Sequence, residues 1–181
     1  MTMKQLIVLS ASVLLIAAAT NTIAGKKCAR AEGNMIVGKV TMDCLDVKGS
    51  AKFNQTTIKG ALHINGPLTA KSSSLNRINI VGNTVLHDST VSGLANVTGS
   101  LEASDTAFKD NIQASSQSVT LNHSTVRNIK IKSDKPHQIT YVYLNDNSVV
   151  SGNITFVGGK GVVKNQRSKV LGKIIGGKIL E

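Results

Sequence analysis

The sequence predicts an all-β fold, a single-stranded right-handed parallel β-helix (β-solenoid) with about 17 residues per coil and seven to eight coils. Three observations predict it: a repeat of nearly constant length, apolar–polar alternation with a period of two, and turn residues at fixed offsets. Each repeat is one structural unit that stacks on its neighbours through parallel ladders. The coils start at Ala51, Leu68, Val85, Leu101, Val119, Val142 and Val162.

The strands of each coil are expected where apolar residues alternate with polar ones. Ile78 and Ile80 form one such pair, and Ile129 and Ile131 form another. This alternation indicates a strand with one buried face, and β-branched side chains suit strands. Glycines between the short strands mark corners. The chain has three Phe, two Tyr and no Trp, so aliphatic residues are expected to fill the core.

The fourth position of each coil is expected to form a corner, because six of its seven residues are Asn, Asp or Ser. Two interpretations stay open. The column supplies turn residues only, or its side-chain amides also bond to one another along the axis. Both interpretations agree on the fold. The column consists of Asn54, Lys71, Asp88, Ser104, Asn122, Asn145 and Asn165.

The coil lengths vary, and this variation favours right-handed winding. A left-handed hexapeptide helix needs an aliphatic residue in every hexapeptide, a rule that this chain does not keep. Parallel crossovers are right-handed by default. The longest coil contains an insertion at residues 133–137, where a proline and charged residues predict a surface loop.

Residues 1–24 read as a secretory signal peptide. Lys4 gives a positive start, residues 6–19 are apolar, and residues 22–24 form a small-residue cleavage site. The 14 apolar residues are fewer than the ~20 that span a bilayer. The sequence therefore predicts a secreted or periplasmic protein with no stable membrane span after removal of the signal.

Residues 25–50 are expected to form an N-terminal cap or first coil, and residues 51–181 the solenoid repeats. A disulfide between Cys28 and Cys44 would close the cap, because two cysteines in an exported chain usually pair. Their separation of 16 residues is about one coil. Both would then lie in one column of adjacent coils, at a spacing of about 4.8 Å that a disulfide accepts. Two thiols without a neighbouring His make a metal site a poor alternative.

The sequence contains no constellation that predicts a catalytic residue, a cofactor or a metal ion. The four histidines fall at different positions in their coils, so stacking is not expected to bring them into one column. Asp88 and Asp105, on neighbouring coils at adjacent columns, are the nearest approach to a catalytic carboxylate pair. Turn use explains both aspartates, which leaves a carbohydrate-active β-helix enzyme as a weaker alternative.

Basic residues concentrate in the last coil and predict a candidate anion-binding site for a glycan or a phosphorylated lipid. Nucleic acid is not expected as a partner, because the chain offers almost no aromatic residues for base stacking. Another interpretation is that these residues protect an exposed strand edge. The last coil also reads as an ordinary coil, so end-to-end pairing with another copy is open. The basic residues are Lys160, Lys164, Arg167, Lys169, Lys173 and Lys178.

Residues 58–66, 91–99 and 150–158 share the pattern apolar-x-Gly-x-apolar-x-apolar-x-Gly. This pattern resembles the repeat of the bactofilins, and the resemblance covers about residues 51–181. It implies a right-handed β-solenoid of similar coil length that polymerises without nucleotide. The bactofilins are mainly cytoplasmic, whereas this chain has a signal peptide and a cysteine pair. The fold is therefore what the resemblance implies for this chain.

The sequence thus predicts an exported, non-enzymatic β-solenoid with a structural or binding role in the bacterial envelope or outside the cell. One alternative is an anion-binding or adhesive module that uses the basic C-terminal coil. The other is a carbohydrate-active β-helix enzyme.

Overall fold

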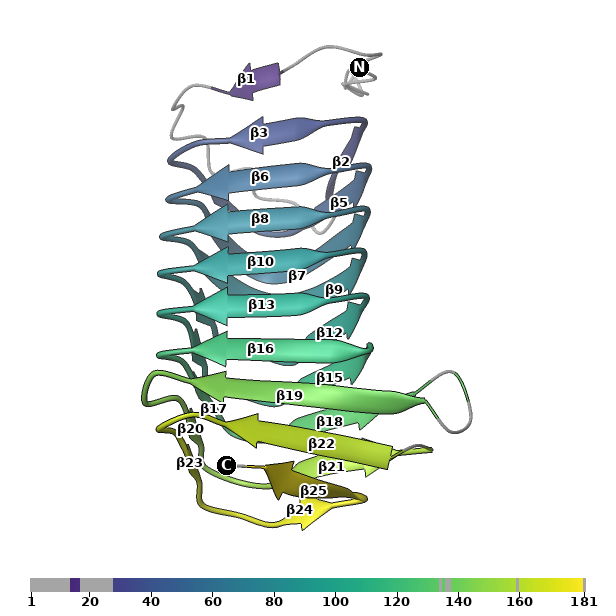
Figure 1. Cartoon of the computed structure of the whole chain (residues 1–181). Helices are drawn as coiled ribbons and strands as arrows, with labels where there is room; N and C mark the ends of the chain where they lie inside the picture. Colours follow the sequence, from purple (N-terminus) through teal and green to yellow (C-terminus); the bar gives the residue numbers. More distant parts are fainter. Residues whose placement is uncertain (1–13, 17–27, 134, 136–137, 159, 181) are drawn as a thin grey trace, which may run out of the picture.

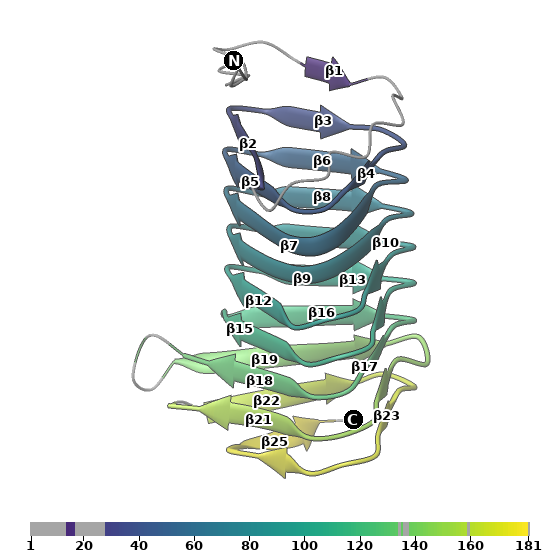
Figure 2. The ribbon, with the colours of Figure 1, turned by 180° about the vertical axis from the view of Figure 1, so that it is seen from behind.

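The computed structural model describes residues 14–16, 28–133, 135, 138–158 and 160–180. They form 25 β-strands, and no helix occurs among them. Successive turns stack along one axis into a rod (Figure 1). In Figure 1 the strands nearest the viewer run to the left as the chain descends. In Figure 2, which shows the rod from behind, the strands nearest the viewer also run to the left as the chain descends. The winding is therefore right-handed, and the predicted parallel β-solenoid is confirmed.

One side of the rod is a ten-stranded parallel sheet, whose outer surface we call face A. Its strands are β1 (Leu14–Ile16), β3 (Met35–Val37), β6 (Ala51–Asn54), β8 (Leu68–Lys71), β10 (Thr84–His87), β13 (Leu101–Ser104), β16 (Ser118–Asn122), β19 (Ile139–Asn145), β22 (Lys160–Asn165) and β25 (Gly177–Leu180).

The other two sides belong to a fifteen-stranded sheet that bends lengthwise into faces B and C. Face B contains β2 (Ala29–Glu32), β5 (Leu45–Lys48), β12 (Ala95–Thr98), β15 (Ile112–Ser115), β18 (Ile129–Lys132), β21 (Ile154–Val157) and β24 (Ile174–Ile175). Face C contains β4 (Thr41–Met42), β11 (Thr90–Val91), β14 (Ala107–Phe108), β17 (Thr125–Val126), β20 (Val149–Val150) and β23 (Lys169–Val170). The long strands β7 (Thr57–Asn65) and β9 (Ser74–Val81) run through both faces.

About nine turns stack from β3 to β25, more than the seven to eight that the sequence predicted. The difference lies at the N-terminal end. Met35 of β3 is in register with Ala51 of β6, and Leu45 of β5 is in register with Leu62 of β7. Residues 28–50 therefore already form regular solenoid turns.

Strand β1 is the part of the predicted signal peptide that the structure describes. It pairs in parallel with β3, with Leu14 opposite Met35. The other residues of segment 1–24 lie outside the described part of the chain, as do Asp134, Pro136 and His137 of the predicted insertion. In the part that is described, no helix has the length and apolar character needed to cross a membrane.

The core is a stack of aliphatic side chains that the alternating strands point inward. Leu62 and Ile64 on face B are typical, and both are buried. All three phenylalanines, Phe53, Phe108 and Phe156, are also buried. Apart from these three rings, the core is built mainly from aliphatic side chains, as the sequence predicted.

The structure corrects two of the predicted coil starts by one residue. Thr84, and not Val85, lies opposite Leu68 in an inward column, and Val85 is 39% exposed. The start predicted at Val162 likewise lies at Val163. A one-residue shift turns every side chain of a strand to the other face. The prediction followed the first apolar residue, whereas the register is fixed by the corner that precedes the strand.

The corrected register also changes the corner column. His87, and not Asp88, lies opposite Ser104, and Asn165 lies opposite Leu144. Asp88 follows in a position where the backbone is left-handed, a conformation that Asp and Asn tolerate better than most residues. The left-handed residues, with φ between 45° and 61°, are Gln55, Ser72, Asp88, Asp105, His123, Asp146, Asn147 and Arg167.

The amide ladder that one interpretation of this corner predicted is present over three turns. Asn145 Nδ2 donates to Asn122 Oδ1 (2.8 Å), and Asn122 Nδ2 donates to Ser104 Oγ (3.3 Å). A second ladder, which the sequence did not predict, lies at the corner between faces C and B. There Asn128 Nδ2 donates to Asn111 Oδ1 (2.7 Å).

A buried column of hydroxyl groups follows the left-handed residues. Ser124 Oγ donates to the carbonyl oxygen of Asn122 (2.7 Å) and accepts from the backbone N–H of Thr106 (3.1 Å). Ser148 Oγ likewise donates to the carbonyl oxygen of Asn145 (2.7 Å) and accepts from the backbone N–H of Ser124 (3.1 Å). The hydroxyls thus satisfy backbone groups that turn inward. The column consists of Thr56, Ser73, Ser89, Thr106, Ser124 and Ser148.

Thr84 differs from this column, because its buried Oγ1 has no hydrogen-bond partner among the described residues. We expect Thr84→Val to raise the free energy of unfolding by about 1 kcal/mol, since valine keeps the shape and removes the unpaired hydroxyl. Thr106→Val is the matched control: its hydroxyl donates to the Ser104 carbonyl (2.9 Å), so its loss should cost about 1–2 kcal/mol. Urea denaturation measures both. A destabilised Thr84→Val protein would contradict the prediction.

Candidate functional site

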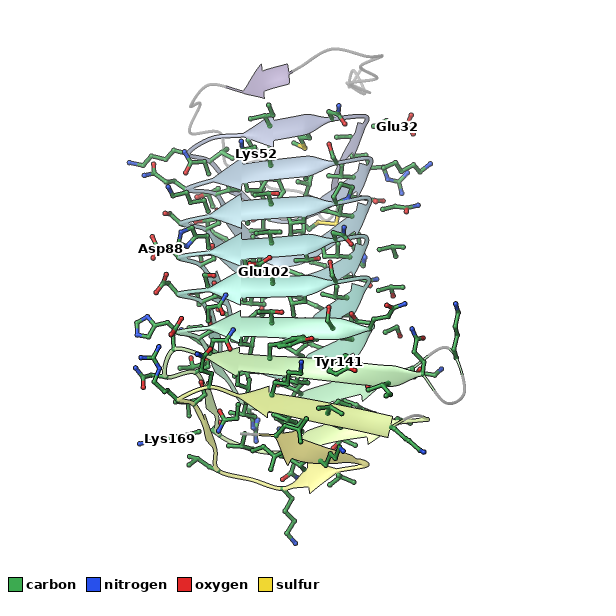
Figure 3. The ribbon with its side chains drawn as sticks, in the orientation of Figure 1. Glu32, Lys52, Asp88, Glu102, Tyr141 and Lys169 are labelled. Atoms are coloured by element: carbon green, nitrogen blue, oxygen red, sulfur yellow. A yellow bond between two sulfur atoms is a disulfide. The ribbon has the colours of Figure 1, made fainter. Side chains whose placement is uncertain are left out.

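The structure spreads the six basic residues of the predicted anion site around the rod. Three are exposed on face A, on strands β22 and β25: Lys160, Lys164 and Lys178. The others lie at the corner after face A, on face C and at the corner between faces C and B: Arg167, Lys169 and Lys173. Figure 3 shows Lys169 at the left edge of the rod, whereas Tyr141 lies on face A, toward the viewer. Arg167 pairs with Asp146 (2.9 Å).

Lys164 belongs to a small aromatic cluster on face A. The ring centroids of Tyr141 and Tyr143, on β19, are 5.8 Å apart with 24° between the ring planes. Lys164 Nζ lies 5.4 Å from the Tyr141 centroid and 5.3 Å from the Tyr143 centroid. These distances suit cation–π contacts. The cluster holds the Lys164 ammonium against the sheet.

Asp88 and Asp105, the aspartates of the enzyme alternative, lie in one left-handed column and not in adjacent columns. Asp88 Oδ2 accepts from Ser72 Oγ (2.9 Å). Asp105 lies between two histidines, 3.8 Å from His87 Nδ1 and 2.7 Å from His123 Nδ1. Sequence reasoning missed this contact, because it expected separate columns to keep the histidines apart. Figure 3 shows Asp88 projecting from an edge of the rod, so this is a surface ladder.

The described residues contain no group of three or more His, Cys, Asp or Glu side chains placed to hold a metal ion. The predicted disulfide between Cys28 and Cys44 is present, with Cα atoms 4.7 Å apart. That distance matches one rung of a parallel sheet, as the spacing of the two cysteines predicted. The disulfide thus joins the chain entering the first turn to the turn below it.

A shallow open groove of about 420 Å³ lies on face B, the face nearest the viewer in Figure 2. Its polar side chains come from two outward columns of four successive strands, β9, β12, β15 and β18. Amides fill most of one column and hydroxyls most of the other, and each column ends in a lysine. The polar lining consists of Asn79, Asn96, Gln113 and Lys130, with Thr98, Ser115 and Lys132.

The charges on face B are separated along the axis. In the first turns, Arg30 lies 3.8 Å from Asp46 and Lys48 lies 3.6 Å from Glu32. Below these pairs, the outward residues of β7, β9, β12, β15, β18 and β21 that the structure describes include no acid: His63, Asn65, Asn79, Val81, Asn96, Thr98, Gln113, Ser115, Lys130, Lys132, Thr155 and Val157. The groove is therefore cationic at its C-terminal end.

A second polar recess, of about 400 Å³, lies around the corner between faces B and A. Ser115 lines both hollows. The recess is formed where Ser116 stands in place of the corner glycine of earlier turns, and Lys135 of the insertion reaches it. It extends the polar surface of the groove toward face A.

Sequence reasoning missed the face B groove, although a signal for it exists. Asn79, Asn96, Gln113 and Lys130 follow one another at intervals of 17 residues. The same interval separates Thr98, Ser115 and Lys132. Aligning the outward residues as well as the apolar ones would have placed these side chains in two adjacent columns.

Comparisons of the chain with protein families, with curated proteins and with solved structures found no match.

Proposed function

We propose that the protein is an exported, non-catalytic scaffold that binds an anionic polymer in the bacterial envelope or outside the cell. The distribution of charge carries this proposal. Residues 129–181 contain nine Lys and Arg and three Asp and Glu. The one acid of this region that the structure describes, Asp146, is paired with Arg167. The remaining cationic side chains project from the C-terminal half of the rod and favour an anionic partner.

The disulfide supports the extracytoplasmic part of the proposal. Disulfides persist in oxidising compartments and are rare in reducing ones. The Cys28–Cys44 bond therefore suggests a non-reducing environment. Secretion or delivery to the periplasm, through the signal peptide that segment 1–24 predicts, would provide it.

The regular corners support the scaffold role. Amide and hydroxyl ladders run along the axis from one turn to the next, and each turn contacts only its neighbours. Such a rod presents columns of side chains at a constant spacing of about 4.8 Å. A repeating surface of this kind suits a repeating ligand.

The proposal predicts salt-dependent binding to an anionic polymer. We expect the purified protein to bind immobilised polygalacturonate at low ionic strength and to release it as salt is added, because salt screens exposed charges. Neutral dextran is the control surface. Binding that does not change with salt, or equal binding to dextran, would contradict the proposal.

A second candidate function is end-to-end association, which the resemblance to bactofilins implies. The last described turn favours it, because Leu171, Ile175, Ile179 and Leu180 are 68%, 48%, 41% and 44% exposed. At the other end, the edge of β3 accepts a parallel strand, β1. Light scattering over a range of protein concentrations tests this candidate, and a constant monomeric mass would rule it out.

A further inference from the structure

We infer that the face B groove binds an extended anionic polysaccharide whose chain runs parallel to the rod axis. This inference rests on the proposed function and assigns it to a surface that does not include the basic C-terminal coil. The ligand class is a glycan that carries carboxylate, phosphate or sulfate groups.

The first argument is the free hydrogen-bonding capacity of the groove. The side chains of Asn96, Gln113, Thr98 and Ser115 make no hydrogen bond to any described residue, although all four are partly or fully exposed along one strip. A side-chain amide both donates and accepts, and so does a hydroxyl. Sugar hydroxyls also donate and accept, so this strip is complementary to a polyol and not only to an anion.

The second argument is charge. Lys130 and Lys132 project from β18 at the C-terminal end of the groove and have no acidic partner among the described residues. Among the described residues, the ion pairs of face B are confined to the first turns, at Asp46 and Glu32. Two ammonium groups beside neutral amides select a ligand that is polar throughout and negatively charged at intervals.

The third argument is spacing. The groove columns repeat once per turn, so their side chains recur about every 4.8 Å along the axis. This rung is close to the length of one pyranose unit in an extended chain. From Asn79 to Lys130 the column covers three rungs, roughly 14 Å. A chain of about three sugar units lying along the axis would therefore meet the amides of Asn79, Asn96 and Gln113 on successive turns and then the ammonium group of Lys130.

The groove chemistry disfavours two other anionic polymers. Single-stranded nucleic acid needs aromatic side chains for base stacking, and the groove lining includes none. A membrane surface would be contacted by apolar or aromatic side chains beside the lysines. The groove instead places amides and hydroxyls there.

The test compares two charge-reversed proteins that carry the same net charge. Lys130→Glu/Lys132→Glu changes the groove, and Lys160→Glu/Lys178→Glu changes exposed positions on face A. We expect the groove variant to lose affinity for polygalacturonate by about tenfold or more and the face A variant by about threefold or less. The neutral variant Gln113→Ala should lose affinity severalfold without any change of charge. Circular dichroism confirms that each variant is folded, and Lys130→Gln/Lys132→Gln serves if the reversal is not tolerated.

Three kinds of result would contradict the inference, and each contradicts a different part of it. Equal losses of affinity in the two charge-reversed proteins, or a larger loss in the face A variant, would overturn the assignment of binding to the groove. The proposed function itself would not be contradicted. Wild-type protein that fails to bind polygalacturonate would overturn both. Tighter binding to poly(dT) or to phosphatidylglycerol vesicles would overturn the choice of a polysaccharide.

Discussion

Gly82→Ala is expected to lower the free energy of unfolding by about 2–4 kcal/mol. Gly82 has φ +151°, a value that residues with a side chain rarely adopt. A Cβ atom there would lie 2.5 Å from the carbonyl oxygen of Gly66, one turn above. The oxygen belongs to the backbone and cannot move without disturbing the next rung. The same close approach repeats at Gly99, whose Cβ would lie 2.5 Å from the Gly82 oxygen.

Two control variants separate the causes of this loss. Gly158→Ala tests backbone conformation alone, because Gly158 has φ +78° but its nearest contact, the Ser133 oxygen, is 3.7 Å away. Gly38→Ala tests neither effect, since no atom lies within 4 Å and its φ is ordinary. Urea denaturation should rank the losses Gly82, then Gly158, then Gly38. A Gly82 variant as stable as the Gly38 variant would contradict the stacking described for this corner.

Removal of the disulfide, by Cys28→Ser/Cys44→Ser, is expected to lower stability by about 3 kcal/mol. The cross-link closes a segment with a sequence separation of 16, and loops of that length give about this stabilisation. In a solenoid each turn contacts only its neighbours, so the loss should appear first in β2, β3 and β5. Hydrogen exchange should therefore become faster in these strands while β13 to β19 keep their protection.

A reducing agent provides the control for the cysteine variant. It should destabilise the wild-type protein by the same amount and leave the double variant unchanged. Uniform loss of protection along the whole rod would contradict a local role for the disulfide. No effect in either protein would show that the first turns are held by strand pairing alone.

The fold could be predicted from sequence because one physical rule repeats along the chain. Each turn has alternating strands and residues suited to corners, so errors in one turn did not alter the overall prediction. The cysteine spacing was equally informative, since one coil length in sequence becomes one rung in space. The errors of register at Thr84 and Val163 arose where the inward position is not the first apolar residue.

The corner hydroxyls show why the sequence pattern within one repeat could not predict which polar side chains are buried. Ser73 and Ser124 follow a turn-forming residue, and a run of polar residues suggests an exposed turn. The left-handed residue before each of them redirects the chain, so the hydroxyl points into the rod. Its partners are backbone groups of the same turn and of the adjacent turn. This role depends on stacking and is not visible within one repeat.

The candidate site was harder to predict, because it is defined by columns and not by neighbours in sequence. The six C-terminal basic residues are dense in sequence but point to different sides. Lys130 and Lys132 are only two residues, yet the sheet places them below three turns of neutral polar side chains. The winding of the solenoid thus separates the six C-terminal basic residues, and it brings the residues of the face B groove together.

Lysine footprinting tests the central claim, that the rod binds an anionic glycan along face B, most directly. The protein is acetylated with and without polygalacturonate, and the modification of each lysine is measured by mass spectrometry. The account predicts that Lys130 and Lys132 are protected by the polymer, while Lys160 and Lys178 are modified equally in both samples. Protection of Lys160 and Lys178, with Lys130 and Lys132 unchanged, would contradict it.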